Sequence, residues 1–246
     1  MIESVNNERV KEIAKLHDKK YRKINNKFLA VGKHLVEEAL KKNIVLELFL
    51  LEGTPNTYGF DATYVSEKVM KKLSDQTSSP KELAVCKIEN NNEIVGNVVM
   101  LDNIKDPGNL GTIIRSAVAF NYQTIILSKE CVDVYNGKVI RSSEGMLFNI
   151  NIIIDDIEKY IYILKNNSYK IYSTDVVTGV SPQKENNKHA IIIGSEANGV
   201  KDSVKALADQ NLKLAMNPLC ESLNAGVSAS ILMYELGGKL WKIYHF

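Results

Sequence analysis

The hydrophobic positions of this chain form two stretches of strands and helices, separated by a polar segment. In the first stretch, Val10, Ile13, Ala14 and Leu16 recur at helical spacing and predict an amphipathic helix. The apolar runs at residues 44–51 and 83–88 predict strands, with helices expected around residues 34–42 and from residues 66–67 onward. These elements together predict a small α/β unit.

The segment at residues 89–96, ENNNEIVG, is polar and rich in asparagine. Segments of this composition are typical of the connection between two domains. We therefore expect a first domain at residues 1–90 and a second at residues 91–246.

In the second stretch, short apolar runs alternate with helical patterns. Strands are expected at residues 97–103, 123–128, 147–154, 169–174, 189–194 and 211–216, and helices from residue 109, at 155–164, after 199 and at 223–236. Apolar strands bounded by helices indicate an α/β fold with a mostly parallel sheet covered on both faces. Ligands of such sheets bind at the carboxyl ends of the strands.

Composition narrows the class of protein. The chain has 246 residues, 45% of them hydrophobic and 24% charged, and a net charge of +2. This indicates a soluble globular protein whose overall charge favours no partner. Its three cysteines, Cys86, Cys131 and Cys220, lack the spacing of a disulfide framework or a zinc site. We expect a cytoplasmic protein without a bound metal, and the absence of a long apolar run or a signal pattern predicts no membrane association.

Positive charge is concentrated at residues 9–33, a segment that contains nine basic residues and only two acidic ones, Glu12 and Asp18. The pattern predicts a helix followed by a basic loop at residues 19–27, KKYRKINNK. A solvated helix face is one interpretation. Cations flanking an aromatic ring also suit single-stranded RNA, through phosphate neutralisation and base stacking. The candidate RNA contacts are Lys19, Lys20, Tyr21, Arg22, Lys23 and Lys27.

Three loops of the second stretch carry the candidate chemistry. In the first, NIKDPGNLGTIIR at residues 103–115, residues 106–108 predict a turn, Asn109 is a suitable N-cap, and the helical wheel directs Arg115 away from the sheet. In the second, IIIGSEANGV at residues 191–200, two glycines bracket Ser195 and Glu196. This is neither a dinucleotide-binding fingerprint nor a phosphate-binding loop.

The third loop, MNPLCESLNAG at residues 216–226, precedes a helix whose first turns are rich in small residues. Small residues permit a close helix contact, either within one subunit or between subunits. All three loops follow predicted strands, so we expect them to meet in one composite site.

In this order and spacing, the three loops resemble the motifs N-x-G-x-x-x-R, G-S-E-x-x-G and E-S-L-N-x-x-x-S/A of the SpoU (TrmH) family of RNA ribose 2′-O-methyltransferases, within the SPOUT superfamily. The resemblance spans residues 97–236. The first ninety residues are similar to the family's substrate-binding domain, which resembles a small ribosomal RNA-binding protein. The resemblance implies a trefoil-knotted α/β domain, S-adenosylmethionine bound in a bent shape, and a homodimer formed through the C-terminal domain.

The resemblance also implies roles for individual residues. The residues expected to bind the cofactor, largely through backbone groups, are Gly194, Leu214, Met216, Leu223 and Thr174. The polar residues expected in the catalytic site are Arg115, Asn109, Glu196, Ser222 and Asn224. Ala197 stands where the family often has glycine, and Ala225-Gly226 replace a more usual branched residue. Both changes are small, so an intact site is expected.

Methyl transfer needs the ribose oxygen, the methyl carbon and the sulfonium sulfur in line, so positioning should supply much of the acceleration. Arg115 is the residue that the family resemblance proposes as catalytic. Because a guanidinium is a poor base at neutral pH, we expect it to hold the target phosphate and stabilise the developing oxyanion. Glu196 is the rival base, and Ser222 and Asn109 are the expected orienting groups.

Three alternatives remain open at this level. The scaffold could belong to an RNA-binding protein without activity, or to a SPOUT enzyme that methylates a base. Among ribose enzymes, the substrate could be transfer RNA. The separate N-terminal domain favours large-subunit (23S) ribosomal RNA.

Overall fold

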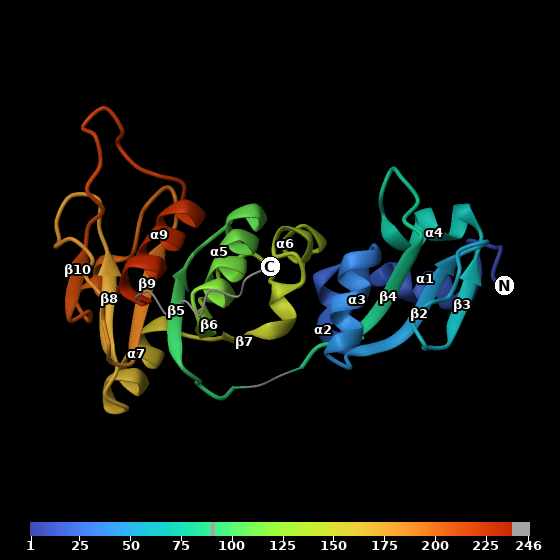
Figure 1. Cartoon of the computed structure of the whole chain (residues 1–246), viewed down its shortest axis with the longest axis horizontal. Helices are drawn as coiled ribbons and strands as arrows, with labels where there is room; N and C mark the ends of the chain where they lie inside the picture. The colour runs from blue at the N-terminus through green and yellow to red at the C-terminus, as the bar shows by residue number, and fades with distance from the viewer. Residues whose placement is uncertain (90–91, 238–246) are drawn as a thin grey trace, which may run out of the picture. The chain divides into compact units, whose positions relative to one another are not determined.

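The computed structural model describes residues 1–89 and 92–237, which fold into two compact units (Figure 1). One unit comprises Met1–Asn90 together with Asp133–Phe148, and the other comprises Asn91–Val132 and Asn149–Phe246. The predicted domain boundary, between residues 90 and 91, lies outside the described residues. The expectation of an uninterrupted second domain differs from the structure, because residues 133–148 belong to the first unit.

The first unit is built on a four-stranded sheet with the order β1-β4-β2-β3. β4 pairs antiparallel with both β1 and β2, whereas β3 pairs parallel with β2. Its strands are β1 Lys27–Val31, β2 Val45–Leu51, β3 Ala62–Val65 and β4 Glu82–Lys87. Its helical segments are α1 Glu8–Ala14, the 3₁₀ turn η1 Lys15–His17, α2 Lys19–Asn25, α3 Lys33–Lys41, α4 Glu67–Ser74 and α6 Gly137–Ser142.

The basic segment at residues 19–27 was expected to be a loop, and this was wrong. Residues 19–25 form α2, because the Asp18 side chain accepts a hydrogen bond from the Lys20 N–H and caps the helix. Asn26 ends the helix in the left-handed conformation (φ 55°), and β1, which the sequence analysis missed, begins at Lys27. The cations at residues 19–23 therefore lie on a fixed helix, and Lys27 lies at the start of a strand.

The helical spacing near the N-terminus is confirmed. Val10, Ile13 and Leu16 are buried and pack in one cluster with Phe49 of β2 and Leu83 of β4. Burial of this apolar stripe against the sheet stabilises α1, which is otherwise too short to persist alone.

Residues 133–148 pack against the first strand of this unit. The ring of Phe28 lies 5.1 Å from that of Tyr135 and 5.5 Å from that of Phe148, between ring centroids. Such tilted aromatic contacts add to the burial of the rings. The segment thus contributes to the hydrophobic interior of the first unit, although in the chain it connects two strands of the other unit.

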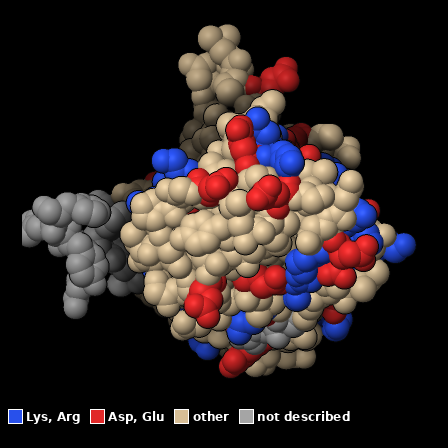
Figure 2. Space-filling model, turned by 90° about the vertical axis from the view of Figure 1, so that its right-hand side faces the viewer, with Lys and Arg blue, Asp and Glu red and all other residues tan. Residues whose placement is uncertain are grey.

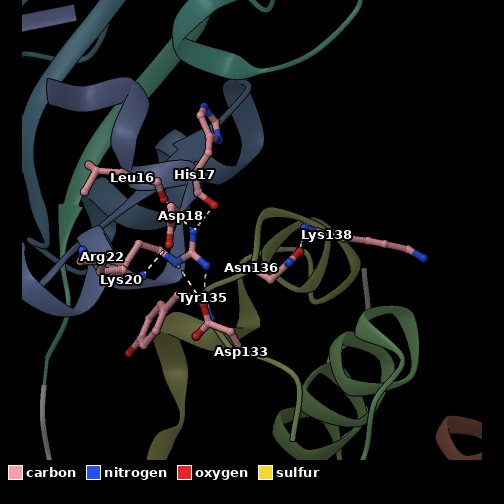
Figure 3. A network of polar contacts seen from close by, with 9 residues as sticks. All are labelled: Leu16, His17, Asp18, Lys20, Arg22, Asp133, Tyr135, Asn136 and Lys138. Carbon is pink, nitrogen blue, oxygen red and sulfur yellow. Dashed lines mark hydrogen bonds and ion pairs between the residues drawn. The ribbon is translucent and has the colours of Figure 1, made fainter. Parts of the chain in front are cut away.

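A buried ion pair holds the same segment. The Arg22 guanidinium donates two hydrogen bonds to the Asp133 carboxylate and others to the backbone carbonyls of Leu16 (2.7 Å) and His17 (2.8 Å), as Figure 3 shows. Arg22 is 5% exposed. It was expected to contact RNA, but its donors are engaged inside the protein, so its role here is structural.

Replacing Asp133 with asparagine is expected to lower the free energy of unfolding by about 3 kcal/mol, because it leaves a buried guanidinium without a counter-charge. The matched control is Glu47→Gln, since Glu47 also forms an ion pair with two hydrogen bonds to an arginine, Arg9, but that pair is partly exposed. Its loss should cost less than about 1 kcal/mol. Urea-induced unfolding followed by circular dichroism measures both, and equal effects would contradict the prediction.

The second unit is a six-stranded sheet in which every pair of neighbouring strands is parallel, in the order β10-β8-β9-β5-β6-β7. This confirms the predicted parallel sheet. Its strands are β5 Asn97–Asp102, β6 Tyr122–Leu127, β7 Asn151–Ile154, β8 Lys170–Thr174, β9 His189–Gly194 and β10 Gln210–Leu212. Its helices are α5 Pro107–Ala119, α7 Ile157–Asn166, α8 Asp202–Lys205 and α9 Ala225–Gly237. The 3₁₀ turn η2 Met146–Asn149, which belongs to the first unit up to Phe148, leads into β7.

Helices cover both faces of this sheet (Figure 1). α5 and α9 pack on one face, against β6 and β9. On the other face, Ile161 of α7 and Val204 of α8 share an apolar cluster with Val98 and Met100 of β5. No helix among residues 1–89 and 92–237 combines the length and hydropathy that a membrane crossing requires.

Several element boundaries differ from expectation; β7, for example, begins at Asn151 and not at residue 147, because residues 146–149 form η2. α5 begins at Pro107 with Asp106 as its N-cap, whose carboxylate accepts from the Asn109 N–H at 2.8 Å, so Asn109 lies inside the helix. Aspartate followed by proline at the first helical position is the stronger start signal. β10 ends at Leu212 and not at residue 216, because its pairing with β8 ends at Leu212 and the chain then leaves the sheet.

Candidate functional site

The carboxyl ends of four neighbouring strands form one edge of the second unit. Asp102 at the end of β5 lies opposite Gly194 at the end of β9, and Thr174 at the end of β8 lies opposite Leu212 at the end of β10. The loops that follow β5, β9 and β10 are the three loops singled out in the sequence. Their predicted convergence is confirmed.

The loop after β9 makes a tight turn that depends on its two glycines. The Gly199 N–H donates to the Ser195 carbonyl at 2.9 Å, with Gly199 in the left-handed region (φ 65°). A Cβ atom on Gly194 would lie only 2.0 Å from the Gly199 carbonyl carbon, so no other residue fits there without moving the backbone. The turn leaves Glu196 at its exposed tip.

A chain of hydrogen bonds connects the three loops. The Asn109 side chain, on α5, donates from Nδ2 to the Glu196 carboxylate and accepts at Oδ1 from Asn224 Nδ2 at 2.8 Å. Asn224 Oδ1 in turn accepts from the backbone N–H groups of Gly226 (2.9 Å) and Val227 (3.2 Å). Asn109 is thus the central residue of the site, and Asn224 caps the first turn of α9.

The direction of this chain follows from its two ends. A carboxylate can only accept hydrogen bonds, and backbone N–H groups can only donate them. Both amides are therefore oriented with Nδ2 toward Glu196 and Oδ1 toward α9. The contact to an ionised carboxylate is charge-assisted and stronger than a neutral one. Asn109 is 8% exposed, so solvent does not compete for its bonds.

Close packing of α5 on α9 supports this arrangement. A Cβ on Gly226 would lie 3.1 Å from Thr112, and the hydroxyls of Ser116 and Ser230 are 2.7 Å apart. Ser230 also donates to the Gly226 carbonyl at 2.6 Å. The small residues of α9 therefore serve an intramolecular helix contact, one of the two interpretations left open by the sequence.

The structure does not join Arg115 or Ser222 directly to the chain of hydrogen bonds. Arg115 lies on the exposed side of α5, as the helical wheel predicted, and no described residue supplies an ion pair or hydrogen bond to its guanidinium. Ser222 lies in the exposed loop before α9, where its carbonyl is 3.3 Å from Cys220 Sγ. Both side chains face solvent and can meet a substrate.

The loop that carries the predicted cofactor residues has unused backbone groups. Leu214, Met216 and Leu223 are half-buried, and within the described part of the chain the N–H and carbonyl groups of Leu214 and Met216 form no hydrogen bond. Exposed apolar surface beside free donors and acceptors suits the adenine and amino-acid groups of S-adenosylmethionine. The residues present therefore fit the cofactor.

The turn after β8 borders the same edge and is held rigidly. Thr174 Oγ1 donates to the Ile192 carbonyl at 3.0 Å. Next to it, the hydrogen bond from Lys205 Nζ (2.8 Å), aided by the backbone N–H groups of Val177 and Thr178, lowers the pKa of Asp175 to about 2. This predicted cofactor position thus lies on fixed backbone.

Sequence reasoning missed Asp102. Its side chain is 1% exposed at the end of β5 and accepts from the Lys201 N–H at 3.1 Å, with Lys201 Nζ 3.5 Å away. It attaches the end of the β9 loop to β5. The feature of the sequence that could have identified Asp102 is an aspartate at the end of an otherwise apolar strand.

The candidate RNA contacts lie on α2 and at the start of β1, in the first unit. Lys19, Lys20 and Lys23 are exposed, Lys27 is half-buried, and Lys20 Nζ lies 5.8 Å from the centroid of the half-buried Tyr21 ring. On the face of this unit shown in Figure 2, basic and acidic residues alternate around an uncharged centre. That face offers no continuous basic surface for a nucleic acid.

Comparison with known proteins agrees with these motifs. The model of the SpoU rRNA Methylase family matches residues 96–234, more than half of the chain, and the model of the MRM3-like substrate binding domain matches residues 7–84. A Bacillus subtilis relative, the 23S rRNA (guanosine(2553)-2′-O)-methyltransferase RlmP, is 36% identical and covers 96% of this chain and 99% of its own length.

Two solved structures show the same fold. A putative RNA methyltransferase of the TrmH family from Porphyromonas gingivalis superimposes with a TM-score of 0.81 at 26% identity, covering 94% of this chain and 97% of its own. An AdoMet-bound rRNA methyltransferase from Sinorhizobium meliloti gives a TM-score of 0.85 at 24% identity over 95% of both chains. With the three motif loops joined at one sheet edge, these matches show that the chain belongs to the SpoU rRNA methylase family.

Proposed function

We propose that this protein transfers the methyl group of S-adenosylmethionine to a ribose 2′-hydroxyl of RNA, and that the RNA is 23S ribosomal RNA. The observation that carries the proposal is the hydrogen-bonded chain from Glu196 through Asn109 to Asn224, which brings the three family motifs into one site. The Bacillus subtilis relative, alike over nearly the whole chain, supports the choice of reaction and RNA.

Gly194, Thr174, Leu214, Met216 and Leu223 are the residues proposed to hold the cofactor. When bound, S-adenosylmethionine supplies an activated methyl group attached to a positively charged sulfur. The protein's share is to hold the acceptor oxygen in line with that methyl group. Backbone groups suit this task, because they are fixed by the sheet edge and need no ordering when the substrate binds.

The acceptor hydroxyl must lose its proton during transfer. Glu196 has one carboxylate oxygen occupied by Asn109, and its exposed position leaves the other free to accept the hydroxyl proton. Arg115 is proposed to bind the adjacent phosphate through its planar fork and to stabilise the developing negative charge. Ser222 is proposed to orient the ribose.

Two partners are proposed for surfaces outside the catalytic site, the substrate RNA and a second copy of the chain. The exposed cations of α2, with Tyr21, are proposed to bind RNA phosphates and bases in a salt-dependent manner. A second copy of the chain is proposed to cover the outer face of α9, where Val227, Ile231 and Tyr234 are 44%, 37% and 39% exposed at helical spacing. The trefoil knot and the cytoplasmic location also remain proposals.

The proposal is tested with unmodified 23S ribosomal RNA transcript, S-adenosylmethionine and the full-length protein. After the methylated nucleotide has been mapped, an RNA oligomer with a single deoxyribose at that position should accept no methyl group, because the 2′-hydroxyl is the acceptor. Its Kd should stay within about twofold of that of the all-ribose oligomer, since phosphate contacts dominate affinity. Methylation of the deoxyribose oligomer would show that the enzyme modifies a base.

A further inference from the structure

The first unit contains a cavity of about 190 Å³ between two segments that are distant in the sequence. One wall comes from the N-terminal region, through Leu16, His17, Leu29 and Val31, and the other from residues 135–141. Ligand sites for drug-sized molecules usually exceed about 300 Å³, so this cavity suits a single ring and not a whole cofactor.

The walls combine apolar, aromatic and hydrogen-bonding surface. Leu16 and Leu29 are buried beneath the cavity, and the half-buried ring of Tyr135 lies beside it against Phe28. Burial raises the pKa of Tyr135 to about 12, which keeps its phenol a neutral hydrogen-bonding group well above physiological pH. Asn136 and Ser74 also line the cavity and add polar groups suited to the edge of a base.

Charges at the cavity favour an anion at its mouth. Lys138 and Arg141 line it and are exposed, whereas its buried cation, Arg22, is neutralised by Asp133. The carboxylate of Asp75 also lines it. In Figure 3 the Lys138 side chain extends away from the Arg22 network. The cations of α2 begin at Lys19, two residues beyond His17 in the chain.

We propose that this cavity takes one unpaired nucleotide of the substrate RNA, with the base against Tyr135 and the adjacent phosphate at Lys138 and Arg141. The inference rests on the proposed function and adds a place where RNA is read. It assigns RNA recognition to residues 135–141, which lie within the methylase match at 96–234 and outside the substrate-binding match at 7–84. Unpaired bases stacked on aromatic rings are the usual basis of sequence-specific RNA recognition.

Two variants of the full-length protein separate occupation of the cavity from surface charge. Gly137→Leu adds a bulky apolar side chain to the cavity lining without changing charge, and a Cβ there would meet within 4 Å only Arg141 Nη1, at 3.4 Å. Arg141→Glu reverses a charge at the mouth. Kd is measured for unmodified 23S ribosomal RNA transcript at several salt concentrations, together with kcat and KM for methyl transfer. Lys68→Glu, an exposed charge reversal on α4 away from the cavity, is the control.

Both variants should raise Kd and KM about tenfold with kcat near that of the wild type. Gly137→Leu should keep the salt slope, whereas Arg141→Glu should reduce it by about one. Circular dichroism and the unfolding midpoint verify that each variant is folded. If either variant binds like the wild type, the cavity does not hold a nucleotide, even though methylation continues. Absence of methyl transfer by the wild-type protein would instead refute the proposed function.

Discussion

Replacing Arg115 with alanine is expected to reduce kcat about a thousandfold, while the Kd for S-adenosylmethionine and the free energy of unfolding stay close to wild-type values. Removing one group that stabilises charge developing in a transition state typically costs this much. The side chain is exposed, and the described residues give it no ion pair or hydrogen bond, so its loss removes little that holds the protein together.

Single-turnover methyl transfer with labelled cofactor measures this effect, and calorimetric titration measures the affinity for S-adenosylmethionine. The control is Lys68→Ala, which removes an exposed cation outside the site. Arg115→Lys retains the charge but loses the planar fork, so most of the activity should still be lost. A kcat for Arg115→Ala within tenfold of the wild-type value would show that Arg115 has no major catalytic role. If the kcat of Arg115→Lys were close to that of the wild type, the planar fork of the guanidinium would not be required for catalysis.

The second large effect is expected at Asn109. Asn109→Leu keeps the size of the side chain but breaks both of its hydrogen bonds, leaving the Glu196 carboxylate and the Nδ2 group of Asn224 without their partner. We expect kcat/KM to fall at least about a hundredfold, because misplacement of reacting groups is costly. The free energy of unfolding should fall by about 2 kcal/mol, since Asn109 is buried and bonded to a carboxylate.

A double-mutant cycle with Asn224→Ala tests whether the chain acts as a unit. If the two amides cooperate, the double variant should lose less stability than the sum of the single variants, by about 1 kcal/mol. Asn167→Leu, at the exposed end of α7, is the control for replacing an asparagine by leucine. Strict additivity of Asn109→Leu and Asn224→Ala would show that their hydrogen bond carries no coupling.

The parallel sheet and the meeting of the motif loops could be predicted, because both follow from local patterns. Runs such as residues 189–194 are apolar throughout, as buried parallel strands require, and the direction of the strands places the loops at one edge. The helical wheel of α5 was also sufficient to place Arg115 in solvent. The pairing of Asn109 with Asn224 involves residues 115 positions apart, and no pattern in the sequence encodes it.

The predictions that were wrong concern positions at which several residues could have played the same structural part. Asp106 and Asn109 are both good N-caps, and the proline at position 107 decides in favour of Asp106. Among the cations of residues 19–27, composition cannot show which one is buried; Arg22 is, because Asp133, 111 residues later, completes its environment. Likewise, the apolar residues of the segment 133–148 do not reveal which of two hydrophobic cores they join.

The attachment of residues 133–148 to the first unit bears on the order in which the chain can assemble on the ribosome. The first ninety residues emerge before the aromatic partners of Phe28 and the Asp133 partner of Arg22 have been synthesised. The N-terminal unit is therefore completed only after β5, α5 and β6 have emerged. A fragment that stops at residue 90 leaves the Phe28 ring without its aromatic contacts and the Arg22 guanidinium without its counter-charge. Separating the two units for expression requires a new covalent connection and not simply a cut at the polar linker.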